Sequence, residues 1–225
     1  MRVLLASIVC EKGDAEANLA RHIEALEEAR AAGCELAIFP EFSLTGSVDP
    51  TRHPERAVAL DDELVLRMVD AAHAARVGAL FGIAERYDGE FFITQVFALS
   101  RTIAGLQRKR HLGDDEVGFS VGADTARFVY GAAGFGAIIC AESGVDFTWD
   151  ASASTGASVL FFCSAPGLYD RRTDEAAWRG GFEWWEGHGL AHARRHAHRL
   201  GLWVAMATQA GATVDEDFPG IAALI

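Results

Sequence analysis

Short apolar runs and amphipathic stretches alternate along the chain from its first residues. Residues 3–9 form an apolar run of strand length, and apolar positions then recur at helical spacing up to Gly33. Asp14 stands before this stretch as a plausible N-cap, and Gly33 stands where a helix C-cap belongs. The next apolar run, residues 36–39, completes a strand, helix and strand cycle, which favours an α/β fold.

The same alternation continues to the end of the chain. A second helix is expected over residues 61–76, with Gly78 as its stop, and turns at residues 87–89 and 102–105 indicate antiparallel strands and therefore a mixed sheet. The further strands that we expect are residues 79–84, 92–99, 106–108, 128–130, 135–139, 157–163 and 202–208. Helical segments are expected over residues 146–154 and up to residue 200, with an irregular aromatic stretch at 165–187 before the last helix.

Composition narrows the class of protein. A chain of 225 residues that is 50% hydrophobic can bury one substantial core, so residues 1–225 are expected to form a single domain. No apolar run approaches the roughly 20 residues that a membrane helix needs. A net charge of −12 disfavours binding to nucleic acid. The four cysteines form no CxxC pair, which fits a reducing cytoplasm best.

Two candidate residues directly follow apolar strands. Pro40 ends the strand at residues 36–39 and Glu41 comes next, while residues 135–139 lead into Cys140. The carboxyl ends of strands are where α/β folds tend to keep their chemistry.

Three motifs in combination point to a family. They are PEFSLTG around Glu41, QRKRHL around Lys109 and IICAESG around Cys140, and together they resemble the nitrilase superfamily of carbon-nitrogen hydrolases. The resemblance extends to ATQAG at residues 207–211 and FPG at 218–220. It implies a four-layer α-β-β-α sandwich with two mixed β-sheets, a homodimer or larger homo-oligomer, and no metal or organic cofactor. Relatives continue beyond the strand at the end of this chain, so we expect the C-terminal strands of the family to be missing here.

The resemblance also implies roles for individual residues. Cys140 would be the nucleophile, Glu41 the general base and Lys109 the oxyanion partner, assisted by the backbone N–H of Ala141. The chemistry suits these residue types, because a thiol is mostly protonated at neutral pH and needs a base and a nearby cation. Glu116, in HLGDDEVGF, matches a further family carboxylate that would orient the substrate or the lysine.

The remaining chemistry-bearing residues leave alternatives open. Glu142 is a candidate for the substrate pocket, and so are Trp184 and Trp185, which could equally bury into a subunit interface. Arg171, Arg172, Arg179 and Glu183 would set the pocket's charge if they face inward. The histidines at 188, 192 and 196 share one helix face, but without an HExxH motif a solvated stripe is favoured over a metal site. GAAGFG at 131–136 reads as a turn, and no GxSxG elbow supports a serine hydrolase.

The motifs favour hydrolysis of a small non-peptide carboxamide through a Cys140 thioester. Nitrile hydrolysis and N-carbamoyl cleavage are the nearest enzymatic alternatives. Nitrilases commonly have Cys-Trp-Glu where this chain has Cys140-Ala141-Glu142, which favours an amide. An inactive scaffold that acts only by binding or assembly is the alternative of another class.

Overall fold

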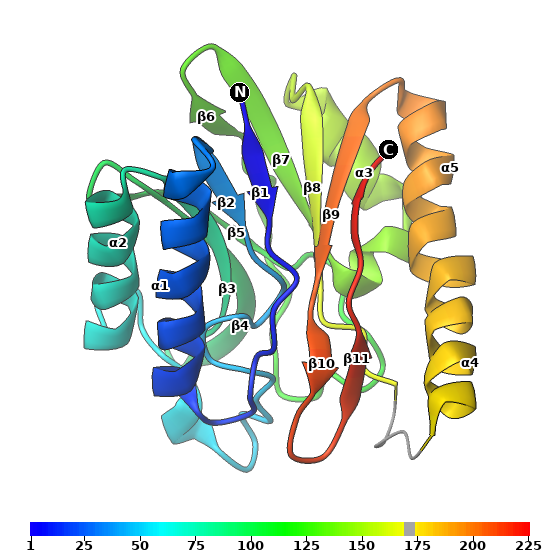
Figure 1. Cartoon of the computed structure of the whole chain (residues 1–225), viewed down its shortest axis with the longest axis horizontal. Coiled ribbons are helices and arrows are strands. Elements are labelled where there is room, and N and C mark those ends of the chain that lie inside the picture. The colour runs from blue at the N-terminus through cyan, green and yellow to red at the C-terminus, as the bar shows by residue number, and fades with distance from the viewer. Residues whose placement is uncertain (169–173) are drawn as a thin grey trace.

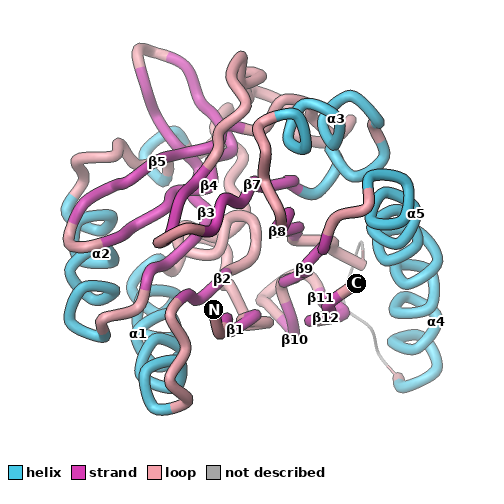
Figure 2. The backbone as a smooth tube through the Cα atoms, turned by 90° about the horizontal axis from the view of Figure 1, so that it is seen from above, coloured by secondary structure: helices cyan, strands magenta, loops and turns pink. Residues whose placement is uncertain are grey.

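Two mixed β-sheets face each other and helices cover their outer sides (Figure 1). The computed structural model describes residues 1–168 and 174–225, so Arg171 and Arg172 lie outside the described residues. Seen from above, α1 and α2 lie on one side of the paired sheets, and α3, α4 and α5 lie on the other (Figure 2). This arrangement confirms the expected α-β-β-α sandwich.

The first sheet has the order β1-β2-β3-β4-β5. The first three strands are parallel, and β3, β4 and β5 are antiparallel neighbours. The strands are β1 (Val3–Leu5), β2 (Leu36–Ile38), β3 (Gly78–Tyr87), β4 (Glu90–Leu99) and β5 (Thr102–Arg108). Residues 102–105, expected as a turn, therefore lie in β5. The pairing of β5 with β4 has a register shift between Phe97 and Ala98.

The second sheet has the order β12-β9-β8-β7-β6, with three parallel strands flanked by an antiparallel strand on each side. Its strands are β6 (Phe128–Tyr130), β7 (Ala133–Ile139), β8 (Val159–Ser164), β9 (Trp203–Thr208) and β12 (Ala222–Leu224). A separate hairpin pairs β10 (Ala210–Ala212) with β11 (Asp217–Pro219). Only the first two residues of the GAAGFG segment form the predicted turn between β6 and β7, and the other four belong to β7.

The helices begin and end where their caps allow. The helices are α1 (Ala15–Ala31), α2 (Glu63–Ala75), α3 (Asp146–Ser154), α4 (Glu175–Trp185) and α5 (Ala191–Leu200). Asp14 caps α1 by accepting a hydrogen bond from the N–H of Ala17 at 3.1 Å, which confirms the predicted N-cap. Asp62 caps α2 in the same way, but α2 ends at Arg76 in the left-handed conformation, and Gly78 already belongs to β3. The prediction of Gly78 as the stop was wrong because Arg76 itself takes the positive φ.

Residues 165–187, predicted to be irregular, contain a helix. Asp174 accepts a hydrogen bond from the N–H of Ala177 at 2.8 Å, and Glu175 pairs with Arg179 one turn later at 2.9 Å. A π-helical turn, Glu186–Leu190, joins α4 to α5. Glycines lower the helix propensity of this segment, which is why the sequence did not predict a helix, but the N-cap at Asp174 fixes where the helix begins.

Three apolar layers hold the sandwich together. One lies between α1, α2 and the first sheet, one between the second sheet and α3, α4 and α5, and one between the sheets. The layer between the sheets contains interlocking aromatic rings, with Phe97 and Phe135 edge-to-face at 5.1 Å and Phe135 and Phe161 at 5.0 Å. Burial of these large side chains is the main force that docks one sheet on the other.

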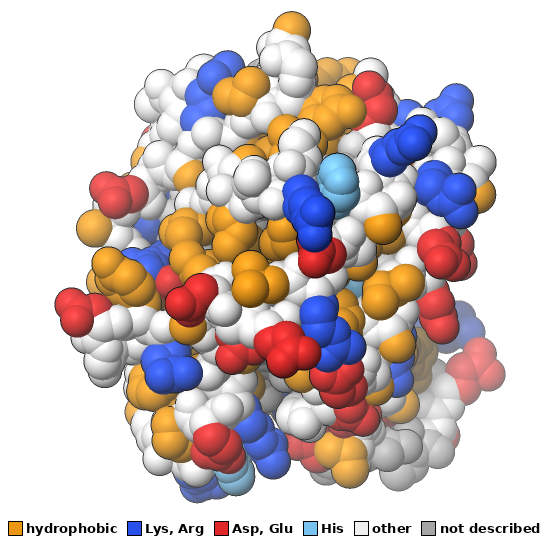
Figure 3. Space-filling view, turned by 90° about the vertical axis from the view of Figure 1, so that its left-hand side faces the viewer, with side chains coloured by type: hydrophobic (Ala, Val, Ile, Leu, Met, Phe, Trp, Pro, Cys, Tyr) orange, Lys and Arg blue, Asp and Glu red, His pale blue; other side chains and the backbone are white. Residues whose placement is uncertain are grey.

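The surface carries charges of both signs. On the face drawn in Figure 3, acidic and basic side chains are interspersed with hydrophobic ones. Within residues 1–168 and 174–225 no helix has the length and hydropathy to cross a bilayer. The four cysteines are free thiols, and the cytoplasmic location stays a prediction.

Candidate active site

Glu41 reaches the interior through the loop after β2. The loop lies directly on β3, where a side chain in place of Gly82 would collide with the backbone of residues 40–42. Ser43 anchors the loop by accepting a hydrogen bond from the N–H of Gly82 at 3.0 Å. Glu41 is only 2% exposed, so its carboxylate depends on partners inside the protein.

Those partners come from both sheets. Oε1 of Glu41 accepts a hydrogen bond from Nζ of Lys109 at 2.7 Å, and Oε2 accepts one from the N–H of Ala165 at 3.2 Å. Lys109 directly follows β5 of the first sheet, and Ala165 directly follows β8 of the second. The carboxylate of Glu41 therefore spans the gap between the sheet ends.

Lys109 is fully buried between two carboxylates. Its ammonium donates to Glu41 and also to Glu116, whose other oxygen accepts from the N–H of Gly113 at 2.7 Å. Burial lowers the pKa of Lys109, but the charge of Glu41, with those of Cys140 in its thiolate form and of Glu116, outweighs this effect and holds the pKa above its usual range. Lys109 is therefore a cation at neutral pH, and Glu116, rather than the exposed Asp115, is its second partner.

Cys140 follows β7 and begins a short 3-10 helix, Cys140–Gly144. Its φ is +42°, an unusual conformation for a residue with a side chain, and such strain persists only where the surroundings fix it. Burial and the charge of Glu41 raise the pKa of Cys140 to about 12, and the charge of Lys109 opposes them. The resting thiol is therefore protonated and needs a base to become a nucleophile.

The structure brings Glu41, Lys109, Glu116 and Cys140 together, and their catalytic roles stay predictions. Ala141 is the second residue of the 3-10 helix that Cys140 opens, and the first N–H groups of a helix have no partner within it. An apolar cluster that includes Phe42, Ile93 and Ile139 packs beside the thiol, with Leu112 and Phe119 at its margin. The arrangement combines a thiol, a carboxylate and a buried cation beside apolar side chains.

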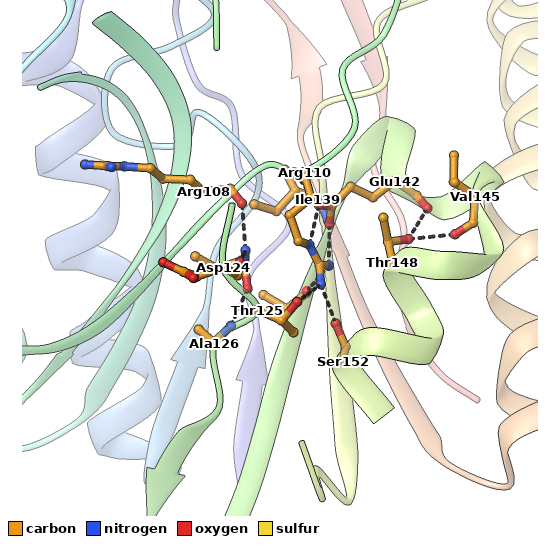
Figure 4. Close-up of polar contacts among 12 residues, drawn as sticks. Arg108, Arg110, Asp124, Thr125, Ala126, Ile139, Glu142, Val145, Thr148 and Ser152 are labelled. Atoms are coloured by element: carbon orange, nitrogen blue, oxygen red, sulfur yellow. Dashed lines mark hydrogen bonds and ion pairs between the residues drawn. The ribbon is translucent and has the colours of Figure 1, made fainter. Parts of the chain in front are cut away.

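The partners of Glu142 do not fit its predicted role in the substrate pocket. It is fully buried, and its carboxylate is occupied by the guanidinium of Arg110 at 2.9 and 3.0 Å (Figure 4). A carboxylate held in this way has no free oxygen to offer a substrate.

The two tryptophans lie in the helix layer. Trp185 is 7% exposed and packs in the apolar layer between the second sheet and its helices, near Phe162. Trp184 is 47% exposed and stacks on His188 with ring centroids 4.3 Å apart. The structure thus places both in or on the helix layer, and whether Trp184 faces a substrate pocket or a subunit interface stays a prediction.

The histidine stripe is not a solvated face along its whole length, because α3 covers part of it. His188 is exposed and His192 half-buried, but His196 is fully buried and stacks flat on Trp149 at 4.5 Å. No group of histidines, cysteines and carboxylates among the described residues could hold a metal ion.

Sequence reasoning missed three residues near the thiol. Ser164, at the end of β8, is fully buried and follows the register pair Ile139 and Cys163, so it lies beside Cys140 across the parallel ladder. Ala165 contributes only its backbone N–H, which no side-chain pattern can reveal. Arg110 was not singled out, although it directly follows Lys109 and its partner Glu142 lies in the cysteine motif.

Comparison with known proteins points to the same family as the three motifs. A family model described as Carbon-nitrogen hydrolase matches residues 4–225. An (R)-stereoselective amidase of Pseudomonas sp is 28% identical over 161 residues, which cover 71% of this chain and 58% of the amidase. An aliphatic nitrilase of Rhodococcus rhodochrous is also 28% identical, over 57% of this chain and 40% of the nitrilase. The chain thus spans about half the length of these two relatives.

A solved structure shares the fold over the whole chain. It is a variant of the amidase from Nesterenkonia sp. AN1 that carries the acetamide moiety of fluoroacetamide on its active-site cysteine. The TM-score is 0.82 at 18% identity, with coverage of 100% of this chain and 82% of that one.

Proposed function

The chain belongs to the carbon-nitrogen hydrolase family, and from that premise we propose that it hydrolyses a small non-peptide carboxamide to a carboxylic acid and ammonia or an amine. The observation that carries the proposal is the position of Lys109, buried between Glu41 and Glu116 and close enough to Cys140 for each to shift the pKa of the other.

Acylation of Cys140 would start with proton transfer. Glu41 takes the proton of the thiol, and Sγ attacks the amide carbon, so that the carbonyl π electrons move onto oxygen. An ammonium has three N–H donors, and within the described residues Lys109 donates hydrogen bonds to two side chains, Glu41 and Glu116. The remaining donor, with the N–H of Ala141, is proposed to bind the oxyanion, a contact whose loss typically costs about 100- to 1000-fold in rate.

Collapse of the tetrahedral intermediate breaks the C–N bond. Glu41 returns its proton to the leaving nitrogen, which departs as ammonia or amine and leaves a thioester on Cys140. Water then attacks the thioester, with Glu41 again as base, and releases the acid and the thiol. Glu116 would hold Lys109 in place throughout.

An amide is favoured over a nitrile by the residue after the nucleophile. Ala141 replaces the tryptophan that nitrilases commonly carry there, and the apolar side chains of Phe42, Leu112 and Phe119 favour a small uncharged acyl group. Nitrile hydrolysis, N-carbamoyl cleavage and an inactive scaffold stay as alternatives, and the homodimer stays a prediction.

Intact mass spectrometry after brief incubation with small amides and nitriles distinguishes these alternatives. An amide should add its mass minus ammonia, whereas a nitrile first adds its full mass as a thioimidate. We expect the amide adduct on the wild type, none on Cys140→Ala, and turnover lowered by about 100- to 10,000-fold in Glu41→Gln. No adduct and no ammonia release with any compound, by a folded protein, would favour the scaffold.

A further inference from the structure

We infer that the ion pair of Arg110 and Glu142 is a positioning device that fixes the backbone of Cys140 relative to Lys109. Arg110 directly follows Lys109 at the end of β5, and Glu142 lies two residues after Cys140 at the end of β7. The pair therefore joins the two sheets at the residues next to the reacting groups. Only its turnover readout depends on the proposed function.

The geometry of the pair is a two-point fork. Nε of Arg110 donates to Oε1 of Glu142 at 2.9 Å and Nη2 donates to Oε2 at 3.0 Å. Two backbone N–H groups complete the carboxylate: that of Arg110 donates to Oε1 at 2.7 Å, and that of Ile139 donates to Oε2 at 2.9 Å. Glu142 thus holds the backbone on both sides, one residue after Lys109 and one residue before Cys140.

The guanidinium has an acceptor for every N–H. Nη1 donates to the hydroxyls of Thr125 at 3.0 Å and Ser152 at 3.1 Å, and the second hydrogen of Nη2 points to the carbonyl of Ala137 at 3.4 Å. Figure 4 shows the guanidinium between Glu142, Thr125 and Ser152, at the junction of β7 and α3. Because all five N–H donors have acceptors, the planar guanidinium is held in one orientation.

Stability alone does not explain such a pair. The side chains of Arg110 and Glu142 are 4% and 0% exposed, and burying two charges costs so much solvation that apolar replacements are often as stable or more so. Apolar residues would not reproduce the hydrogen bonds with which the pair fixes the backbone beside Cys140. Cys140 needs this restraint, because a free chain would leave its φ of +42°.

The chain contains a matched control on the other side of Lys109. Arg108 forms a fork with Glu85, with Nε to Oε2 at 2.8 Å and Nη2 to Oε1 at 2.6 Å, and Glu85 is fully buried. This fork lies within the first sheet, between β3 and β5. It has the same chemistry without a link to the Cys140 segment.

The test compares Glu142→Gln, Arg110→Lys and the double variant Arg110→Met/Glu142→Leu with Glu85→Gln. A Cys34→Ser background removes the half-buried thiol, and Cys10 and Cys163 are buried, so iodoacetamide should modify Cys140 alone. Alkylation rates, kcat and KM on the hydrolysed amide, and unfolding midpoints are measured for each protein.

We expect alkylation to slow about tenfold or more in Glu142→Gln, in Arg110→Lys and in the double variant. A displacement near 1 Å lowers turnover by about 100-fold, so kcat should fall by that factor while KM changes less than about threefold. The double variant should remain folded and yet slow, and Glu85→Gln should react within about twofold of the wild type.

Several outcomes would overturn the inference. One is a folded double variant with the alkylation rate and kcat of the wild type. Another is a loss of alkylation rate and kcat in Glu85→Gln equal to that in the Arg110 and Glu142 variants. A third is failure of all three Arg110 and Glu142 variants to fold, which would mean that the pair is needed for folding. If the wild type hydrolyses no amide, the proposed function fails, but the alkylation rates still decide the role of the pair.

Discussion

The two halves of the sandwich are built alike but contribute differently to the site. Each half has three parallel strands with antiparallel neighbours, and each buries a neutral histidine against an aromatic ring, His22 on Phe39 and His196 on Trp149. The first half supplies the carboxylate of Glu41 and the cation of Lys109. The second half supplies the thiol of Cys140 and the N–H of Ala165.

This division makes the site depend on how the halves are docked. Neither half contains both the thiol proposed as nucleophile and the carboxylate proposed as base, so a shift between the sheets separates the two groups even where each half keeps its own fold. The two arginine forks show the contrast at close range, because Arg108 binds within the first half and Arg110 binds across to the second. A buried contact across the halves should therefore matter more than a similar contact within one.

The largest expected difference is in stability on breaking each fork. Glu142→Ala leaves the cation of Arg110 buried without its partner, which costs about 3–5 kcal/mol. Glu85→Ala should cost about 1–3 kcal/mol, because the Arg108 side chain is 22% exposed and rests over the rings of Tyr87 and Phe92. Urea unfolding measures both, and an equal or larger loss in Glu85→Ala would contradict the contrast.

The second expected effect is a loss of stability in acid through the buried histidines. Burial lowers the pKa of His22 to about 4, while Nδ1 faces the carbonyl of Asn18 at 2.7 Å and Nε2 faces Ser43 at 3.0 Å. The unfolded chain binds the proton near pH 6.5, so stability is present above that pH and is lost as the pH falls toward 4. Between pH 7 and pH 5 the loss from His22 is about 2 kcal/mol.

His196 should show the same direction in the second half. Burial and the charges of Arg195 and Arg199 lower the pKa of His196 to about 4, with Asp146 opposing them. Unfolding free energies of His22→Gln, His196→Gln and wild type at pH 7 and pH 5 test both. Each variant should lose less stability than the wild type over this interval, and a wild-type slope in His22→Gln would show that its ring is not the acid-sensitive group.

Local signals in the sequence were sufficient for much of the fold. The Asp14 cap and the helix at Asp146–Ser154 follow from neighbouring residues, and apolar runs located the strands that end at Glu41 and Cys140. The helix α4 was missed because Gly180 and Gly181 lower helix propensity, although its cap at Asp174 was visible.

The site could be predicted only as far as its motifs reach. The cluster of Glu41, Lys109, Glu116 and Cys140 was predicted from flanking residues. The ion pair of Glu142 was not, because its partner Arg110 lies 32 positions away and follows a strand of the other sheet. Helical spacing likewise put His188, His192 and His196 on one face without showing that α3 covers His196. Tertiary contacts of this kind need the docked halves.

The smallest expected effect is from ion pairs at the surface of each half. Arg67 pairs with Glu16 across α1 and α2 at 2.6 Å, and Arg179 pairs with Glu175 along α4 at 2.9 Å, with all four side chains at least 45% exposed. Water and salt already screen these charges, so Arg67→Gln and Arg179→Gln should leave the urea midpoint within error of the wild type. Arg67 makes a two-point contact with its carboxylate, as both buried forks do. If Arg67→Gln nevertheless lowered the midpoint as far as Glu85→Ala, fork geometry rather than burial would set the contribution of each pair, and the contrast between the halves would lose its physical basis.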